Sequence, residues 1–568
     1  MRLVFLFSFL LLLLFSCANQ ENNGTNEQVA EGLPPLEQSA EEDALGTVDI
    51  TVTGSEAGIA AFKRGLLLLH SFEYDDARTA FQEAQAADST MVMAYWGEAM
   101  THNHPLWRQQ EIEDALAVLN RLAPTKAERL ALAETPLERD FLSALEQLYA
   151  PEGTKQERDQ AYSSYLAKMK AKYPDQQEVA AFYALSVLGA VPVGRDEAAY
   201  EKAARIAQGV TAENPNHPGA LHYLIHAYDD PSHAPKAVPA ANNYSKVAPA
   251  AAHALHMPSH IYVSMGMWDD VISSNIASWD ASVARMERKE LDDNARSYHA
   301  LHWLMYGLTQ QGRYNEAKKI MGDLKKYTAT EPNRAARSYM VTMLANYLVE
   351  TDDWDNAAVW SMSADREDLN ILTRGIYHFS EGWRAYKQND QEALATTIQA
   401  MADERKDAAN QVTASGAPMC SAAGSNRSLP NQLDIDQARV MALELEAMQA
   451  QLQGDLIKTE KLLAEATALE QKLSYAYGPP RIVMPSYELY GRWLLEQGRP
   501  TEAMEQFEYA LAKGPGRLHA LAGAWQAAEA TKNQSRADEL AELLRENIRG
   551  GDTEVKARFM PNNLLSAI

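Results

Sequence analysis

Apolar and polar residues alternate with the period of an α-helix from about residue 57 to the end of the chain. Helix-favouring Ala, Leu, Glu, Gln and Met dominate, and the alternating β-branched runs that are typical of strands are scarce. The pattern therefore predicts an all-α fold. At 568 residues the chain is too long for one ordinary compact core, so the helices are expected to stack as a repeat array.

Small residues and an aromatic residue recur at the positions where two helices of a unit would cross. They are Gly491, Gly498, Ala503, Phe507 and Ala510 in the clearest unit, residues 484–517, and Gly65, Ala77, Phe81 and Ala84 in an early one. This pattern resembles the tetratricopeptide repeat (TPR), whose period is about 34 residues. The resemblance covers most of residues 57–545. It implies a right-handed superhelical solenoid of helix-turn-helix units with a concave inner face, and says little about chemistry.

The first residues of the chain have the pattern of an export signal. A positive start and a short apolar run lead into Leu14-Phe15-Ser16-Cys17, which is typical of a secretory signal peptide and too short for a comfortable membrane span. Leu-x-Ser-Cys resembles the bacterial lipobox, which implies cleavage before Cys17 and a lipid on that cysteine. The membrane is thus one expected partner. Ala18 after the cysteine favours the outer membrane over the inner, facing either the periplasm or the cell surface.

The rest of the chain divides by composition. Residues 17–53, rich in Asn, Gln, Glu, Gly and Pro, are expected to form a disordered tether after the signal peptide at 1–16. Residues 54–410 form the expected N-terminal block of repeats and residues 436–568 the C-terminal block. The Ser-, Ala- and Gly-rich residues 411–435 between them interrupt the helical pattern and are predicted to be a loop.

The net charge of −25 excludes one class of partner. Nucleic-acid binding needs a basic surface that can neutralise phosphates, so no nucleic-acid partner is expected. The sequence also has no phosphate-binding glycine loop, no Gly-x-Ser-x-Gly and no His-Glu-x-x-His.

Histidines gather in one stretch of the chain. Nine of the 14 lie between His217 and His302, where even spacing gives about two. Repeat units that begin at Pro218, Ala252 and Tyr298, set by residues other than histidine, place most of these side chains at the positions that line the concave face of TPR proteins. His217 and His233 fall outside this register and are interpreted as loop residues. Pro258 is expected to kink the second unit's first helix.

Steps of three and four residues stack the in-register side chains on one face of each helix, and neighbouring helices lie about 8–10 Å apart. The groove is therefore predicted to carry a transition-metal site, because imidazole suits zinc, copper or iron at such spacings. The candidate ligands are His222, His226, Asp229, His253, His256, His260, His299 and His302. Candidate accessory residues are Glu98, His102 and Tyr306.

Three functions stay open on the sequence alone. The first is a lipid-anchored solenoid that binds a metal, with a ligand or partner beside it. The second is a metal-free interaction scaffold whose groove holds a protein or peptide. The third is a metal-dependent hydrolase or oxidoreductase with open coordination positions. No catalytic residue is singled out.

A longer similarity supports the architecture. His222-Tyr-Leu-Ile-His226 and His253-Ala-Leu-His256-Met-Pro-Ser-His260, with Tyr477-Gly-Pro-Pro480 later in the chain, resemble a group of bacterial TPR lipoproteins with a His-rich central segment. The resemblance implies the same stack of repeats and supplies no activity.

Overall fold

The structure, a computed structural model, describes residues 44–356, 365–412 and 430–560. Its regular structure is almost entirely helical. The two strands among the described residues, β1 (Asn103–His104) and β2 (Gln109–Gln110), form one short antiparallel pair. The expected signal peptide, Cys17 and most of the expected tether and loop lie outside the described residues.

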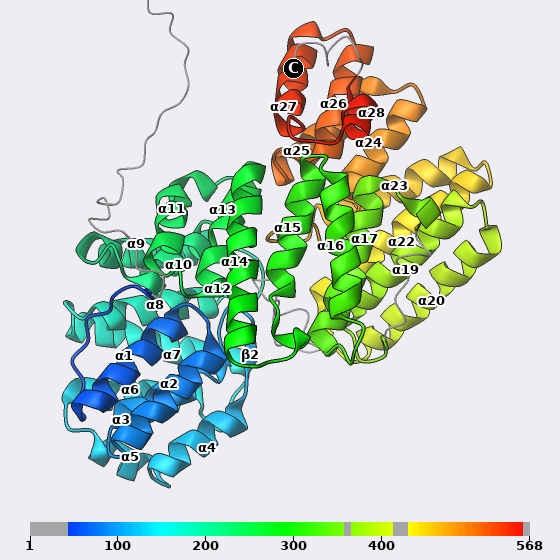
Figure 1. Cartoon of the computed structure of the whole chain (residues 1–568). Coiled ribbons are helices and arrows are strands. Elements are labelled where there is room, and N and C mark those ends of the chain that lie inside the picture. The colour runs from blue at the N-terminus through cyan, green and yellow to red at the C-terminus, as the bar shows by residue number, and fades with distance from the viewer. Residues whose placement is uncertain (1–43, 357–364, 413–429, 561–568) are drawn as a thin grey trace, which may run out of the picture. The chain divides into compact units, whose positions relative to one another are not determined.

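The helices follow one another along the chain with short connections (Figure 1). The N-terminal helices are α1 (Glu56–His70), α2 (Tyr74–Ala87), α3 (Val92–Met100), α4 (Ile112–Leu122), α5 (Lys126–Leu132), α6 (Pro136–Leu148), α7 (Lys155–Lys172), α8 (Gln177–Gly189) and α9 (Glu197–Glu213). The central group is α10 (Pro218–Ala227), η1 (Ala234–Ala237), α11 (Val238–Val247), α12 (Ala252–His256), α13 (Pro258–Met265), α14 (Trp268–Arg288), η2 (Asp293–Ala295), α15 (Tyr298–Gln310), α16 (Tyr314–Tyr327), α17 (Arg334–Thr351) and η3 (Trp354–Asn356). The last group is α19 (Ile371–Lys387), α20 (Gln391–Ala409), α22 (Gln432–Leu452), α23 (Leu456–Glu470), α24 (Ser486–Glu496), α25 (Pro500–Lys513), α26 (Leu518–Ala530), α27 (Gln534–Asn547) and α28 (Thr553–Phe559).

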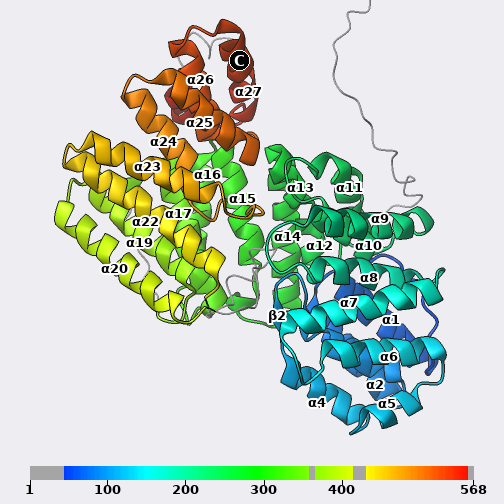
Figure 2. The same cartoon turned by 180° about the vertical axis from the view of Figure 1, so that it is seen from behind.

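Consecutive helices pack side by side as hairpins. α1 packs on α2, α2 on α3, α14 on α15, and α24, α25 and α26 on one another in order, and both views show these neighbours together (Figures 1 and 2). Each hairpin thus covers the apolar face of the next, as a repeat stack requires. The predicted all-α repeat solenoid is confirmed.

A phenylalanine between two glycines sets the spacing of the clearest repeats. A Cβ added at Gly65 or at Gly97 would lie 2.8 or 2.3 Å from the ring of Phe81 on α2. Phe507 on α25 meets Gly491 and Gly523 in the same way. Each ring therefore fills the space that two missing side chains leave, one on its own hairpin and one on the next.

The apolar core has two main parts that meet within α14. One runs from Ile50 to Val271, together with Trp303, Tyr306 and Tyr477, and the other from Ile272 to Met560. In the second part α22 packs directly on α19 and α20.

The packed part of the chain also begins earlier than residue 54. Ile50 and Val52 are buried, and the Thr47 amide donates to the Asn216 carbonyl at 2.9 Å. The amide of Thr53 donates to a carboxylate oxygen of Glu138 at 2.6 Å. Residues 44–53, predicted to be tether, therefore lie along the helices, because two apolar side chains and these hydrogen bonds attach them.

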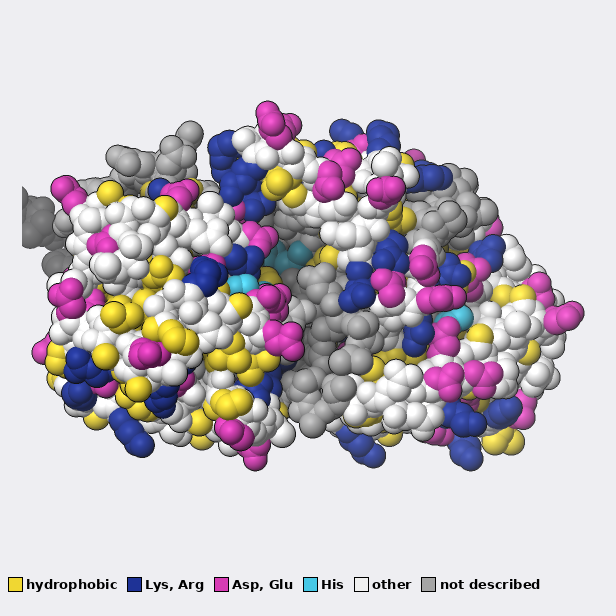
Figure 3. Space-filling model, turned by 90° about the horizontal axis from the view of Figure 1, so that it is seen from below, with side chains coloured by type: hydrophobic (Ala, Val, Ile, Leu, Met, Phe, Trp, Pro, Cys, Tyr) yellow, Lys and Arg dark blue, Asp and Glu magenta, His cyan; other side chains and the backbone are white. Residues whose placement is uncertain are grey.

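Charged side chains of both signs are mixed on the face of the molecule that Figure 3 shows. Histidine side chains are visible there inside a hollow near the middle of the view. Among the described residues, no helix combines the length and the apolar character needed to cross a bilayer.

We expect Gly97→Ala to lower the free energy of unfolding by about 1–3 kcal/mol, because the new methyl group would collide with the buried Phe81 ring. The matched control is Gly209→Ala on α9, where a Cβ meets nothing within 4 Å. That change should stabilise the protein by about 0.5–1 kcal/mol through helix propensity. Urea unfolding of the two variants measures both values, and equal effects would contradict the proposed role of the close crossing.

Candidate metal centre

The three helix starts predicted from the repeat register are those of the structure. α10 begins at Pro218, α12 at Ala252 and α15 at Tyr298. α12 ends at His256 and α13 begins at Pro258, so the helix breaks where the proline was expected to kink it. These helices bring the central histidines together in two groups of three.

The first group is His222, His226 and His253. One nitrogen from each ring lies within 4.8 Å of the other two. The Nε2 atoms of His222 and His226 are 3.1 Å apart, and the rings of His222 and His253 have centroids 5.0 Å apart.

Phe72 covers the first group. Its ring centroid lies 4.4 Å from that of His222 and 5.6 Å from that of His253. Phe72 follows the end of α1 with φ 55°, a left-handed conformation that favours glycine and costs a bulky residue on the order of 1–2 kcal/mol. Glycines take the same place after α15 and α24, at Gly312 and Gly498. The packing around the histidines therefore holds this strained backbone.

The second group is His256, His260 and His299, whose nitrogens also lie within 4.8 Å of one another. The Nε2 atoms of His256 and His260 are 3.2 Å apart. The rings of His256 and His299 have centroids 4.4 Å apart. Trp303, one turn after His299 on α15, packs against His260 with the ring centroids 4.5 Å apart and the ring planes tilted by 39°.

Partners outside the groups fix the other nitrogen of several rings. His260 Nδ1 lies 2.5 Å from Asp229 Oδ2, and His222 Nδ1 lies 2.8 Å from the carbonyl oxygen of His70. His256 Nδ1 lies 2.7 Å from Asn275 Oδ1. The Asn275 Nδ2 atom donates to the Val271 carbonyl, so its Oδ1 atom faces His256 as an acceptor. In all three rings Nδ1 therefore carries the proton that is donated.

Burial keeps the imidazoles neutral. It lowers the pKa of His256 to about 3 and that of His302 to about 4. It also lowers the pKa of His222, His226 and His253 well below the ordinary value of 6.5, and the neighbouring histidines add to the effect. Neutral imidazole with a proton on Nδ1 leaves a lone pair on Nε2, which is the form that binds a metal.

The pair His256–His260 follows from these assignments. Both rings donate from Nδ1, so in the neutral state both Nε2 atoms carry lone pairs, and these face each other at 3.2 Å. Two lone pairs at that distance repel. A positive charge between them, either a proton on one ring or a metal ion on both, removes the repulsion.

The remaining two predicted ligands lie beside the groups. Asp229 accepts from His260 Nδ1 and so fixes the orientation of that ring. The Nε2 atom of His302 lies 3.2 Å from Asn346 Oδ1. The predicted groove is also more enclosed than expected: His222 and His260 are 0 % exposed, and His253 is half-buried.

The accessory candidates make their contacts elsewhere. Glu98 accepts from Gln82, Gln85 and Arg121. His102 Nδ1 contacts Glu111 at 2.8 Å. Tyr306 accepts from Arg517, which also pairs with Glu350 and Glu488.

A buried network that the sequence did not reveal supports the first group. Glu178 lies between His70 Nε2 at 2.7 Å and His217 Nε2 at 3.1 Å. Burial raises the pKa of Glu178, but the two imidazoles outweigh it and lower the value to about 2. His217, predicted to be a loop residue, caps α10 instead, and the amide of Ala220 donates to its Nδ1. Its position directly before Pro218 is a capping signal, whereas nothing in the sequence connects His70 or Glu178 with this region.

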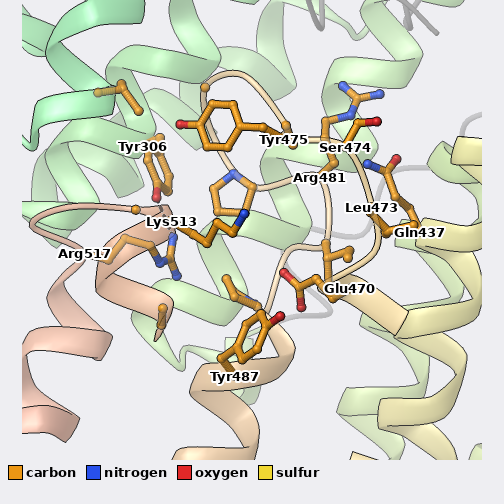
Figure 4. Close-up of a pocket in the computed structure, with 18 of the residues that line it drawn as sticks. Tyr306, Gln437, Glu470, Leu473, Ser474, Tyr475, Arg481, Tyr487, Lys513 and Arg517 are labelled. Carbon is orange, nitrogen blue, oxygen red and sulfur yellow. Dashed lines mark hydrogen bonds between the residues drawn. The ribbon is translucent and has the colours of Figure 1, made fainter. Parts of the chain in front are cut away.

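A cavity of about 110 Å³ lies close to the second group. Figure 4 shows side chains that line it, from α15 and from the part of the chain that runs from α22 to the start of α26: Tyr306, Gln437, Glu470, Ser474, Tyr475, Arg481, Tyr487, Lys513 and Arg517. Burial raises the pKa of Glu470 to about 7, although Ser486 donates to its carboxylate. The cavity thus combines aromatic walls, cationic groups and a carboxyl group that changes charge near neutral pH.

Trp303 lies between the cavity and the histidines. A Cβ at Gly478, which lines the cavity, would lie 2.1 Å from the indole ring. The same indole packs against His260 and has its centroid 4.8 Å from that of His256. A ligand in the cavity therefore has one aromatic side chain between itself and the second group.

The fold and these two groups define a class: a TPR-like α-helical repeat protein with buried sets of histidines arranged like metal ligands. No protein-family model and no curated protein matches the chain. Among solved structures, a chain of Naa15/Naa10 bound to HypK-THB aligns with 89% of this chain and 72% of its own length, at 14% identity and a TM-score of 0.23. Yeast Tom70 aligns with 86% of this chain and 99% of its own, at 12% identity and a TM-score of 0.31. The overlap is too loose to add to the account of the site.

The metal-free protein should lose stability as the pH falls below about 6.5. The pKa of His256 is about 3 when folded and 6.5 ordinarily, so between these values the unfolded chain binds a proton that the folded chain does not. The free energy of unfolding should thus fall by about 1.4 kcal/mol per pH unit for this one residue. The free energy of unfolding is measured with urea at several pH values between 7.5 and 4.5. Its dependence on pH should be weaker by this amount in His256→Gln than in wild type. An unchanged slope would contradict the neutral state of His256.

Proposed function

We propose that this chain is an exported, lipid-anchored repeat protein of the bacterial cell envelope that binds a transition metal through its buried histidines. The observation that carries the proposal is the facing pair His256 and His260, each oriented by a partner on Nδ1. Two nitrogens bound to a tetrahedral ion at about 2.0–2.1 Å lie about 3.3 Å apart. The observed 3.2 Å agrees with this spacing.

The surroundings favour a metal over a proton as the positive charge. A third imidazole, His299, points its ring at the same place, and a proton shared by two rings needs no third. Asp229 on His260 makes a carboxylate–histidine pair of the kind that commonly supports metal-bound imidazole and strengthens it as a ligand. Zinc, copper and iron all suit such donors.

The cavity beside Trp303 is the place we propose for a ligand or the side chain of a partner. Lys513, Arg481 and Glu470 line it together with tyrosines, so it suits a small molecule with an acidic group and an apolar part. This site takes the place of the open concave groove expected from the repeat pattern, because the histidines themselves are enclosed.

The metal is tested by elemental mass spectrometry on the full chain without a histidine tag, with Cys17→Ser to keep it free of lipid. At least one equivalent of zinc, copper or iron is expected. His256→Ala/His260→Ala should lose the metal of the second group, whereas His378→Ala, a half-buried histidine on α19 paired with Glu404, should keep the full content.

The metal content of these proteins decides between the proposed metal site and a metal-free protein. Metal lost only from the double variant supports the proposal. No metal in any of the proteins, even after incubation with zinc and copper, would refute it. The histidines would then form a hydrogen-bonded network within a protein-binding scaffold, and crosslinking would be the next experiment.

The lipid anchor has its own test. In a bacterial host grown with labelled palmitate, the full chain should take up label and sediment with the membranes. Cys17→Ser should abolish the label and release the chain, since residue 17 is the proposed attachment point, whereas Ser16→Ala should keep both. Separation of inner and outer membranes then tests the location that Ala18 favours, and an unlabelled wild-type chain would exclude the anchor.

A further inference from the structure

We infer that the site is dinuclear: each group of three histidines holds one ion, and both ions are copper in the monovalent state. This inference rests on the proposed function and extends it from a metal site to a pair of sites. Two observations carry the inference: the two groups have the same arrangement of histidines, and they lie next to each other.

The groups match in their ligand geometry. Each contains two histidines four residues apart in the chain, on α10 in one group and across the α12–α13 break in the other, with Nε2 atoms 3.1 Å and 3.2 Å apart, respectively. Each takes its third ring from another helix: His253 comes from α12 to join α10, and His299 comes from α15 to join α12 and α13. Each also has a large aromatic ring against it, Phe72 on one side and Trp303 on the other.

An unsatisfied nitrogen marks the first group as incomplete without an ion. His253 Nε2 is buried and has no hydrogen-bond partner among the described residues. Leaving such a buried atom unpaired is unfavourable. An ion bound by the first group would satisfy the ring of His253 directly, and would bind the lone pair that the His222–His70 hydrogen bond leaves on His222 Nε2.

The groups are neighbours. The rings of His226 and His260 have centroids 5.7 Å apart, and those of His253 and His256 are 6.1 Å apart. His253 and His256 follow one another on the same short helix α12. Two ions would thus lie in one continuous cluster of six imidazoles, close enough to act on the same small molecule.

The small negative charge around the six imidazoles favours monovalent over divalent ions. The donors are neutral imidazoles, and the carboxylate hydrogen-bonded to them is Asp229. Two divalent ions would bring four positive charges into this buried place, whereas two monovalent ions bring two. Burying excess charge is strongly unfavourable, and three imidazoles complete the coordination of Cu⁺, which accepts three ligands more readily than Zn²⁺ does.

The test is an anaerobic titration of the full Cys17→Ser chain with Cu⁺, in competition with a chromogenic Cu⁺ chelator. Wild type should bind two equivalents. His253→Ala and His299→Ala, which remove one ring from each group, should each bind one tight equivalent, and His378→Ala should bind two. X-ray absorption of the loaded protein should show about three nitrogen neighbours per copper.

Each other result has a definite meaning. One equivalent in wild type, lost in His299→Ala, would leave the proposed metal site standing and overturn the dinuclear one. One equivalent lost only in His253→Ala would overturn both the dinuclear site and the proposed site at His256 and His260. A wild-type chain that binds no Cu⁺ and no Zn²⁺ would overturn both the proposed metal site and the dinuclear site. Two equivalents of Zn²⁺ bound as tightly as Cu⁺, measured with a zinc-sensitive dye, would overturn the choice of a monovalent ion. Should a variant fail to fold by circular dichroism, the wild-type stoichiometry still decides the number of ions.

Discussion

The burial of each helix hairpin against the next one determines where every inner side chain of this protein can go. Phe81 occupies the space that Gly65 and Gly97 leave on two successive hairpins, so the backbones approach closely. At such spacing, side chains on the inner positions of neighbouring first helices have no solvent between them. Whatever residues the sequence places there must satisfy one another.

In the central repeats those residues are histidines, and this explains both their neutrality and their order. A charged imidazole in such a place would lack solvation, so burial lowers the pKa values and leaves lone pairs pointing inward. Asp229, Asn275 and the carbonyl group of His70 then fix which nitrogen points inward. Orientation therefore comes from atoms behind the rings, and the folded chain alone determines which nitrogens face one another.

The sequence predicted this arrangement as far as local rules reach. Helix periodicity and the crossing residues gave the starts at Pro218, Ala252 and Tyr298 and the convergence of the rings. It did not predict the contacts that orient them, since His70 and Glu178 lie far from the cluster in the chain. The sequence also did not predict how fully the site is enclosed, because enclosure depends on how repeats tilt against each other, and the repeat pattern carries no signal for that.

The second histidine group is separated from the cavity by Trp303, and the contacts of this side chain restrict how the group could be reached. The Trp303 ring contacts that of His260, and a Cβ at Gly478 would overlap the indole, so the indole cannot move toward the cavity without displacing the segment that carries Tyr475 and Tyr477. That segment also contacts α9, since Tyr477 and Tyr200 place their hydroxyl oxygens 3.4 Å apart. A molecule that enters the cavity would press on the same segment, next to Glu470, whose pKa is about 7. A ligand in the cavity would therefore lie against the loop that meets Trp303 beside the second histidine group.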